Sequence, residues 1–278
     1  GLYKSEDGGD NWVQVADLSG HNPVYQVQVH PTNGNVYIGT NEGLLYSDQQ
    51  GSNLQPLGNL PDFGQVSSIQ INPENPQIIY TTIATIWDSN NINDDIRGLY
   101  KSTDAGNTFS LINPTPNAND LFSAELVFMN PGFPDTLYLV SDWDNTVITH
   151  DGGITWTDPN DLTTEPFPGL SRGSNWKLKI QGALTGIAPN PQNQNEAVAF
   201  SRATLWKTTD AGNIFKDAST LFTGFAWSWW NDAIEFDRYN PERFATFNND
   251  VAMVITNTGG DYFDHRNDGV WEFYDAGE

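Results

Sequence analysis

Carboxylates and tryptophans recur together in short polar segments of this chain. Asp142-Trp143-Asp144 sets a tryptophan between two aspartates, and Trp87-Asp88 opens a longer polar stretch. Tryptophan faces can stack on sugar rings while carboxylates accept hydrogen bonds from the sugar hydroxyls. Paired carboxylates could also do general acid–base work on a glycosidic bond, given a suitable separation. The residues expected to bind a ligand are Glu42, Trp87, Asp88, Asp94, Asp142, Trp143, Asp144, Arg202, Trp229 and Asp250.

The same residue types also suit ordinary solvated loops, because Asp, Asn and Gly all favour turns. Two of the segments, residues 93–95 and 142–144, could hold calcium, which prefers clustered oxygen ligands, although neither matches an EF-hand loop. The four histidines are scattered without the spacing of a transition-metal site. The chain has no cysteine, which excludes disulfide and thiol chemistry. We therefore expect no cofactor, with calcium as the open alternative.

A repeated octet determines how these residues are positioned. Its pattern is Ser or Thr, any residue, Asp, any residue, Gly, any two residues, and an aromatic residue. Two further copies are worn, with Gln49 and Thr258 in place of the aspartate. The full copies begin at Ser5, Ser102, Thr149 and Thr208, and the worn copies at Ser47 and Thr256.

The octet is typical of a tight hairpin, because Asp accepts hydrogen bonds from backbone N–H groups of the turn and Gly takes a conformation that a Cβ would strain. We expect the terminal aromatic residue to lie between neighbouring sheets. The octets resemble the Asp-box (BNR) motif of sialidases, sortilin-type receptors and xyloglucan-cleaving glycosidases. That resemblance implies a β-propeller in which each octet joins the third and fourth strands of a blade at the outer rim. The octet aspartates are then structural residues: Asp7, Asp104, Asp151 and Asp210.

The segments between octets favour short strands. Residues 25–31 alternate in polarity and end at a proline, and residues 36–40 and 43–46 supply two more strands before the octet. Later units repeat this order, which predicts an all-β fold of five complete four-stranded antiparallel blades preceded by strands three and four of another. Residues 269–274, or sequence outside this chain, would complete the first blade. Six blades are expected, with seven as the alternative.

We expect a single β-propeller domain over residues 1–278. Residues 1–4 repeat residues 98–101, from the middle of a later unit, and no methionine begins the chain. The chain is therefore expected to be a segment of a longer natural protein.

In propellers, loops from strand two to strand three, and from strand four to the next blade, gather on one face around the axial channel. The acidic and tryptophan-bearing segments fall in the first class of loop. Residues 225–232 fall in the second class and contain Trp227, Trp229 and Trp230, of which at least one should point into the core by strand alternation. This face is the expected ligand-binding surface.

The net charge of −23, from 35 acidic and 12 basic residues, restricts the possible partners. Such a field repels phosphate backbones and anionic membrane surfaces, and the basic footprint of nucleic-acid binding is missing. No stretch approaches the roughly 18 apolar residues of a membrane span. Solubility in a salty or extracellular medium explains the charge, and divalent-cation binding is the alternative. We expect an extracellular or cell-surface location, a glycan or protein ligand, and a place within a larger multidomain chain or assembly.

Two functions remain open. The first is a binding or scaffold propeller without catalysis, favoured by the repeats, the acidity and the missing catalytic signatures. The second is a glycoside hydrolase acting on β-glucan, since residues 229–243 resemble a segment of the xyloglucanases in which a Trp-rich run leads into an Asn-Pro turn. A sialidase is disfavoured by the six arginines and the missing Arg-Ile-Pro tripeptide. The Asp-box photosystem assembly factor is disfavoured by the missing basic patch.

Overall fold

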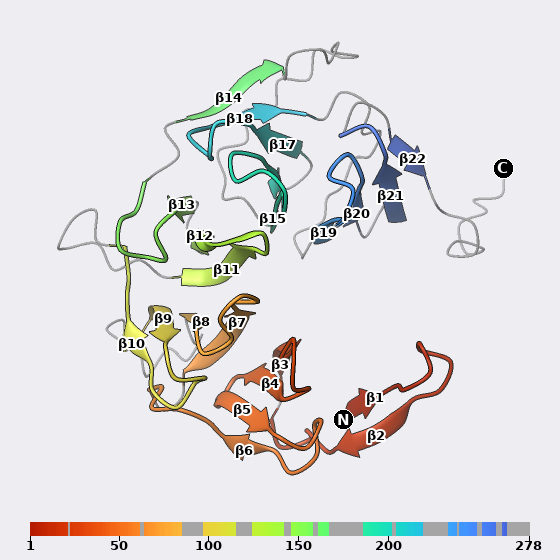
Figure 1. Cartoon of the computed structure of the whole chain (residues 1–278), viewed down its shortest axis with the longest axis vertical. Coiled ribbons are helices and arrows are strands. Elements are labelled where there is room, and N and C mark those ends of the chain that lie inside the picture. The colour runs from red at the N-terminus through yellow and green to blue at the C-terminus, as the bar shows by residue number, and fades with distance from the viewer. Residues whose placement is uncertain are drawn as a thin grey trace, which may run out of the picture. The chain divides into compact units, whose positions relative to one another are not determined.

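The computed structural model describes residues 1–21, 23–61, 64–84, 97–114, 124–141, 146–157, 161–166, 186–201, 204–218, 233–237, 239–248, 252–259 and 263–265. Across these ranges the regular secondary structure consists of strands (Figure 1). No helix in this part of the chain is long and apolar enough to cross a membrane. The predicted all-β composition is therefore confirmed.

Three sheets have four antiparallel strands in chain order. The first contains β3 (Val24–Val29), β4 (Val36–Thr40), β5 (Gly43–Ser47) and β6 (Gln55–Pro56). The second contains β7 (Gln65–Ile71), β8 (Ile79–Ala84), β9 (Gly98–Ser102) and β10 (Ser110–Leu111). The third contains β19 (Ala233–Phe236), β20 (Phe244–Asn248), β21 (Ala252–Thr256) and β22 (Phe263–His265).

The other sheets depart from four strands. β1 (Leu2–Lys4) and β2 (Val13–Ala16) form a hairpin, as expected for strands three and four of a unit. β11 (Ala124–Asn130), β12 (Phe133–Ser141) and β13 (Thr146–Thr149) form a sheet whose fourth strand is reduced to a bridge between Ile148 and Thr157. The last sheet orders β15 (Gly186–Pro189), β16 (Ala197–Ser201), β17 (Thr204–Thr208) and β18 (Ile214–Asp217), with β14 (Asp161–Pro166) parallel to β18. The sequence did not predict β14.

The chain divides into two compact units. In the first, Tyr37 and Leu44 of one sheet pack with Val66, Ile69 and Ile79 of the next. In the second, Leu205 packs with Phe236 and Phe244 in the same way. Apolar alternation along the strands therefore buries sheet against sheet, which is the main source of stability in such layers.

Each octet joins the third and fourth strands of its sheet, as predicted. The first-position hydroxyl donates to the third-position aspartate, at 2.8 Å from Ser102 to Asp104 and 2.7 Å from Thr149 to Asp151. That hydroxyl also accepts the fifth-position N–H, at 2.8 Å from Gly106. The aspartate in turn accepts the seventh-position N–H, at 2.9 Å from Thr155 to Asp151. The worn copy at Ser47 keeps the hydroxyl half of this arrangement, since Gly51 N–H donates to Ser47 Oγ at 3.1 Å.

The fourth-position residue of the octet connects two sheets. It adopts a left-handed backbone, with φ 60° at Ala105, and its N–H donates to the turn between strands one and two of its own sheet, at 2.9 Å to Gln77. Its carbonyl faces the preceding sheet, where Tyr37 donates to Ala105 at 3.4 Å and Tyr80 to Gly152 at 3.2 Å.

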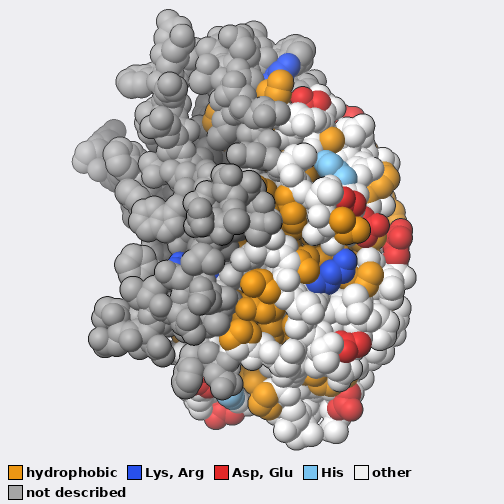
Figure 2. All heavy atoms as spheres, turned by 90° about the vertical axis from the view of Figure 1, so that its left-hand side faces the viewer, with side chains coloured by type: hydrophobic (Ala, Val, Ile, Leu, Met, Phe, Trp, Pro, Cys, Tyr) orange, Lys and Arg blue, Asp and Glu red, His pale blue; other side chains and the backbone are white. Residues whose placement is uncertain are grey.

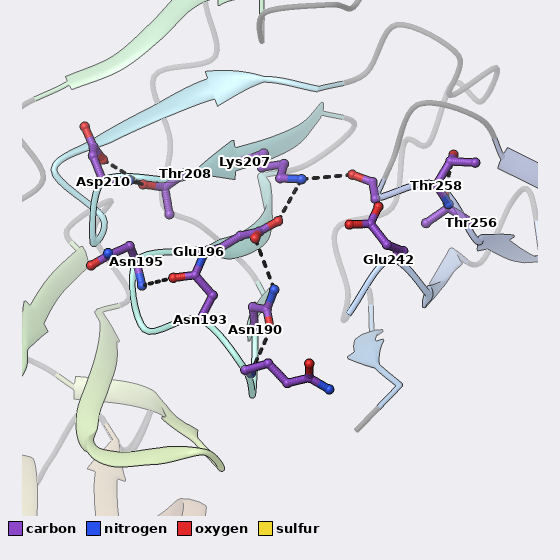
Figure 3. Close-up of polar contacts among 12 residues, drawn as sticks. Asn190, Asn193, Asn195, Glu196, Lys207, Thr208, Asp210, Glu242, Thr256 and Thr258 are labelled. Atoms are coloured by element: carbon purple, nitrogen blue, oxygen red, sulfur yellow. Dashed lines mark hydrogen bonds and ion pairs between the residues drawn. The ribbon is translucent and has the colours of Figure 1, made fainter. Parts of the chain in front are cut away.

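Lysines that precede the octet make the same connection. Lys101 Nζ donates to the carbonyl of Gly152 at 2.9 Å, and Lys207 Nζ donates to the carbonyl of Gly259 at 3.0 Å (Figure 3). Lys207 also pairs with Glu196 at 2.7 Å, and both side chains are mostly buried. The backbone polar groups of the turn are thus satisfied by neighbours on both sides.

One expectation about the terminal aromatic residue is wrong. Phe109 and Phe215 are buried as predicted, but Trp12 is 62% exposed. Phe109 is covered because it packs with Tyr37 and Leu44 of the preceding sheet. In the described part of the chain no sheet precedes the β1–β2 hairpin, so Trp12 lacks that cover. Residues 269–274, expected to complete this blade, lie outside the described residues, and the number of blades remains a prediction.

Two glycines at the fifth position of an octet allow the cost of backbone strain to be measured apart from the cost of side-chain crowding. Gly9 and Gly106 have φ of 101° and 91°, but a Cβ on Gly106 would lie 2.8 Å from Leu57, whereas one on Gly9 would meet nothing nearer than 3.9 Å. Gly9→Ala should therefore destabilise the fold by about 1–2 kcal/mol through backbone strain alone. Gly106→Ala should cost a further ~1–3 kcal/mol through overpacking. Urea unfolding of both variants measures the difference, and equal losses would contradict it.

Two tyrosines, each on the second strand of its sheet, test whether the hydrogen bond to the fourth-position carbonyl stabilises the fold. Tyr80 donates to Gly152, whereas the hydroxyl of Tyr138 is buried and finds no partner among the described residues. Tyr80→Phe should lower the free energy of unfolding by about 1 kcal/mol, because it removes one hydrogen bond. Tyr138→Phe should be neutral or stabilising, because it removes a buried group that is not hydrogen-bonded. Thermal unfolding of the two variants is the measurement, and a larger loss for Tyr138→Phe would refute the assignment.

Candidate ligand-binding face

The first loop that joins strand two to strand three in the chain is a short turn. Asn41 and Glu42 join β4 to β5, and Thr40 at the end of β4 is buried. The Thr40 hydroxyl accepts the N–H of Glu42 at 3.1 Å and donates to the carbonyl of Gly43 at 2.9 Å. The buried hydroxyl of Thr40 thus satisfies one N–H and one carbonyl of the turn.

This turn meets the loop that leads from β2 to β3. The N–H of Asn41 donates to the carbonyl of Pro23 at 3.3 Å, and His21 Nδ1 lies 3.2 Å from Glu42 Oε2. Both side chains stay accessible, with 37% of His21 and 56% of Glu42 exposed. Glu42 therefore lies where a ligand could reach it, beside a histidine that the sequence analysis did not select.

A second tie between the two loop classes lies one sheet further on. Asn113, just after β10, accepts the N–H of Leu99 at 2.8 Å and donates to the carbonyl of Arg97 at 3.0 Å. Gly98 has φ 141°, and a Cβ there would collide with Asn113. Asn113 thus holds the backbone at the start of β9. The two loop classes are therefore in contact beside both of these sheets.

Of the ten predicted ligand-binding residues, Glu42 is the one that the described ranges include. The other nine lie outside them. In the chain they fall between β8 and β9, β12 and β13, β16 and β17, β18 and β19, and β20 and β21. The ligand-binding role of these nine residues stays a prediction. They are Trp87, Asp88, Asp94, Asp142, Trp143, Asp144, Arg202, Trp229 and Asp250.

Aspartates of the octets accept hydrogen bonds within their own turns, and these bonds lower their pKa. Hydrogen bonds from the side chain and backbone of Asn11, and from Ser5, lower the pKa of Asp7 to about 2. Burial raises the pKa of Asp151, but hydrogen bonds from Thr155 and Thr149 outweigh it and bring the value to about 2. A carboxyl group that stays ionised at such acidity cannot serve as a general acid near neutral pH. The carboxylates of Asp7 and Asp151 are thus occupied by hydrogen bonds within their own turns.

One carboxyl group has the opposite tendency. Glu235 lies on β19, the first strand of its sheet, and crowding by the surrounding protein raises its pKa although part of the side chain remains accessible. A raised pKa shifts a carboxyl group toward its protonated form, which is the form that a general acid uses. No group of three or more His, Asp or Glu side chains in the described ranges is arranged to hold a metal ion.

Basic side chains do little to offset the acidic ones at the surface. Lys101 and Lys207 reach backbone carbonyls between sheets. Among the described atoms visible in Figure 2, Asp and Glu side chains are scattered among apolar and uncharged ones, and Lys and Arg are fewer. The surface therefore presents a negative field to an approaching partner.

Compared by sequence, the chain matches no family model and no curated protein. Solved structures are similar in fold. An ancestral GH74 enzyme has a TM-score of 0.63 at 17% identity over 89% of this chain and 31% of its own. The GH74 xyloglucanase from Xanthomonas campestris has a TM-score of 0.61 at 14% identity over 95% of this chain and 48% of its own. YCF48 bound to D1 peptide has a TM-score of 0.54 at 12% identity over 88% of this chain and 69% of its own.

The chain is a β-propeller. Its antiparallel sheets in chain order and its similarity to these structures agree on that fold. It spans less than half of the length of either GH74 enzyme. At these identities the similarity concerns the fold, because one propeller architecture supports many unrelated activities.

The low pKa values predict how acid unfolds the propeller. A carboxyl group with a lowered folded pKa stabilises the fold above its ordinary pKa of 3.8 and loses that effect as the pH falls toward the folded value. The urea concentration at the midpoint of unfolding should therefore decrease as the pH is lowered from about 4 to about 2. Asp151→Asn should lower the midpoint at pH 7 and flatten this acid limb. Asp10→Asn, at the sixth position of an octet, is the control and should change neither. An unchanged slope in Asp151→Asn would contradict the assignment.

Proposed function

We propose that this propeller is a binding module of a secreted or cell-surface protein and holds a glycan or a protein on the face where its two loop classes meet. The observation that carries the proposal is the contact between those classes, through His21 with Glu42 and through Asn113. Loops held to one another and to a rigid sheet supply the pre-organised polar groups that a binding site needs.

The octets support membership in one group of propellers, those with the Asp-box motif. Their hydroxyl, aspartate and glycine are hydrogen-bonded within the turn as the octet pattern predicts, and this supports the inference that the chain is an Asp-box propeller. The octet aspartates then belong to the frame, which leaves the loop carboxylates as the groups available to a ligand. Glu42, Asp142 and Asp250 are the principal candidates among them.

The charge favours particular ligands. A surface at −23 would attract a cationic protein segment and would accept a neutral sugar, whose hydroxyls can donate to carboxylates. It would repel nucleic acid and anionic lipid headgroups. The similar structure of YCF48 is bound to a peptide, which supports a protein ligand for a propeller of this size.

A glycoside hydrolase of the xyloglucanase type is the second candidate. Two specific observations favour it, namely the TM-scores of 0.63 and 0.61 to GH74 enzymes and the raised pKa of Glu235. Such an enzyme needs a second carboxyl group across the scissile bond. Asp88, Asp142, Asp144 and Asp250 are the loop residues that would supply it.

Glycan and peptide arrays, followed by a reducing-end assay on each glycan that binds, separate the two functions. The binding proposal predicts capture of a ligand without release of reducing ends. Glu42→Gln or Asp142→Asn should weaken capture about tenfold, as expected when a charged hydrogen bond worth ~1.5 kcal/mol is lost.

Glu74→Gln, in the exposed turn between β7 and β8, is the matched control and should bind normally. Release of reducing ends that Glu235→Gln or Asp142→Asn abolishes would establish the hydrolase instead. No capture of any glycan or peptide would refute the binding proposal.

A further inference from the structure

The turns that join strand one to strand two carry an asparagine at the same place. In four sheets the fourth residue after strand one is an asparagine whose side-chain oxygen accepts the N–H of the residue two positions later, as asparagine commonly does in turns. The acceptors and their distances from that nitrogen are Asn33 at 2.9 Å, Asn75 at 3.3 Å, Asn193 at 3.1 Å and Asn240 at 3.2 Å. The four amides therefore differ chemically through the residues that follow them.

The residue after the asparagine decides which nitrogen could react with the amide. It is proline at positions 76 and 241, glutamine at position 194 and glycine at position 34. Proline has no backbone N–H, so its nitrogen cannot become a nucleophile. The side chain of Gln194 hinders approach to its own backbone nitrogen, whereas Gly34 leaves the nitrogen open. Asn33-Gly34 is the one Asn-Gly pair in the sequence.

The backbone around Asn33 suits attack by the Gly34 nitrogen on the side-chain amide. The turn from β3 to β4 is one residue shorter than the other three, and Gly34 adopts a left-handed φ of 76° within it. The Gly34 N–H donates to the carbonyl of His30 at 3.4 Å, a long hydrogen bond that costs little to release. Asn35 N–H lies 2.9 Å from Asn33 Oδ1, which gains negative charge as a nucleophile adds to Cγ. A donor for that charge is thus already in place.

Solvent reaches this turn for a reason that is common to the repeat. Asn33 is exposed, and so are Asn75, Asn193 and Asn240. The sheets that carry the last three have all four strands of the unit. The exposure of Asn33 therefore belongs to the turn and does not depend on where the chain begins.

We propose that Asn33 is a deamidation site of the folded propeller. A base from solvent removes the proton of the Gly34 nitrogen, and that nitrogen forms a bond to Asn33 Cγ. The bond from Cγ to Nδ2 breaks, and ammonia leaves with a proton from solvent, so that a five-membered succinimide remains. Water opens the ring at Cγ to give aspartate, or at the main-chain carbonyl carbon of residue 33 to give isoaspartate. In both products an OH group has replaced the NH2 group of the amide.

The two products affect the turn differently. Aspartate adds a negative charge at an exposed position. Isoaspartate also adds a methylene group to the backbone, because the chain then continues through the side chain. The turn closes through the N–H of His30, which donates to the carbonyl of Asn35 at 2.7 Å, and the added methylene lies between these two residues. Isoaspartate should therefore lower the stability of the fold more than aspartate does.

Peptide mapping of the intact chain after storage in mildly alkaline buffer tests the site. Chymotrypsin releases residues 26–37, which contain Asn33, by cleaving after Tyr25 and Tyr37. Conversion of the amide to the acid should be about tenfold or more faster at Asn33 than at Asn193, because Gly34 lacks a hindering side chain. Storage in water enriched in oxygen-18 should label the product, since water opens the succinimide. Electron-transfer fragmentation distinguishes isoaspartate from aspartate.

Asn33→Asp is the matched control. Its peptide over residues 26–37 already carries the acid and should gain no further mass or label. The stored chain that contains isoaspartate should unfold at a lower temperature than the freshly prepared Asn33→Asp variant. Conversion at Asn33 no faster than at Asn193 would overturn the proposal, as would conversion that occurs in urea but not in the native chain. Asn33 lies at the opposite end of β4 from Glu42, so the result is independent of the ligand proposed above.

Discussion

The fourth residue of the octet, seen most fully at Ala105 and Gly259, carries the constraint on which the rest of the structure depends. A left-handed backbone there turns the N–H toward the turn of its own sheet and the carbonyl toward the preceding sheet. At Gly259, for example, the N–H donates to Glu242 at 2.8 Å and the carbonyl accepts from Lys207 at 3.0 Å. One peptide group on each side thus couples neighbouring sheets, and the adjoining glycine is required because a Cβ would strain or crowd it. This geometry explains why the same residue types recur in the octets, without assigning them a catalytic or ligand-binding role.

The same constraint explains what the sequence could and could not predict. Octet hydrogen bonds were predictable because their partners lie within eight residues, and hairpins and strand order were predictable because the pattern recurs along the chain. The contacts of Lys4, Lys101 and Lys207 span 46, 51 and 52 residues, so their partners depend on how sheets stack. The sequence signal for them was present, since each lysine directly precedes the first octet residue. The exposure of Trp12 was missed because it depends on the neighbouring sheet and not on the octet.

The candidate site was predictable to a smaller extent. Strand order places Glu42 in a loop from strand two to strand three, and the structure confirms that placement. His21 and Asn113 were not foreseen, because each acts through a contact with a second loop that no local pattern encodes. The strand β14 was missed for a similar reason, since its pairing with β18 joins residues far apart in the sequence, such as Asp161 and Ile214. Loops carry function in this architecture, and loops are the part that a repeat predicts least.

Native-state hydrogen exchange at the fourth-position amides tests the central claim most directly. If these residues couple the sheets, the amides of Ala105, Ala211 and Gly259 should exchange as slowly as those of the adjoining strands, because each donates to a turn of its own sheet that contacts with the neighbouring sheet keep from opening. The amide of Gly8, in the first hairpin, should exchange faster and serves as the internal reference. Exchange at Ala105, Ala211 and Gly259 as fast as at Gly8 would contradict the account, because the octets would then be local turns without a role between sheets.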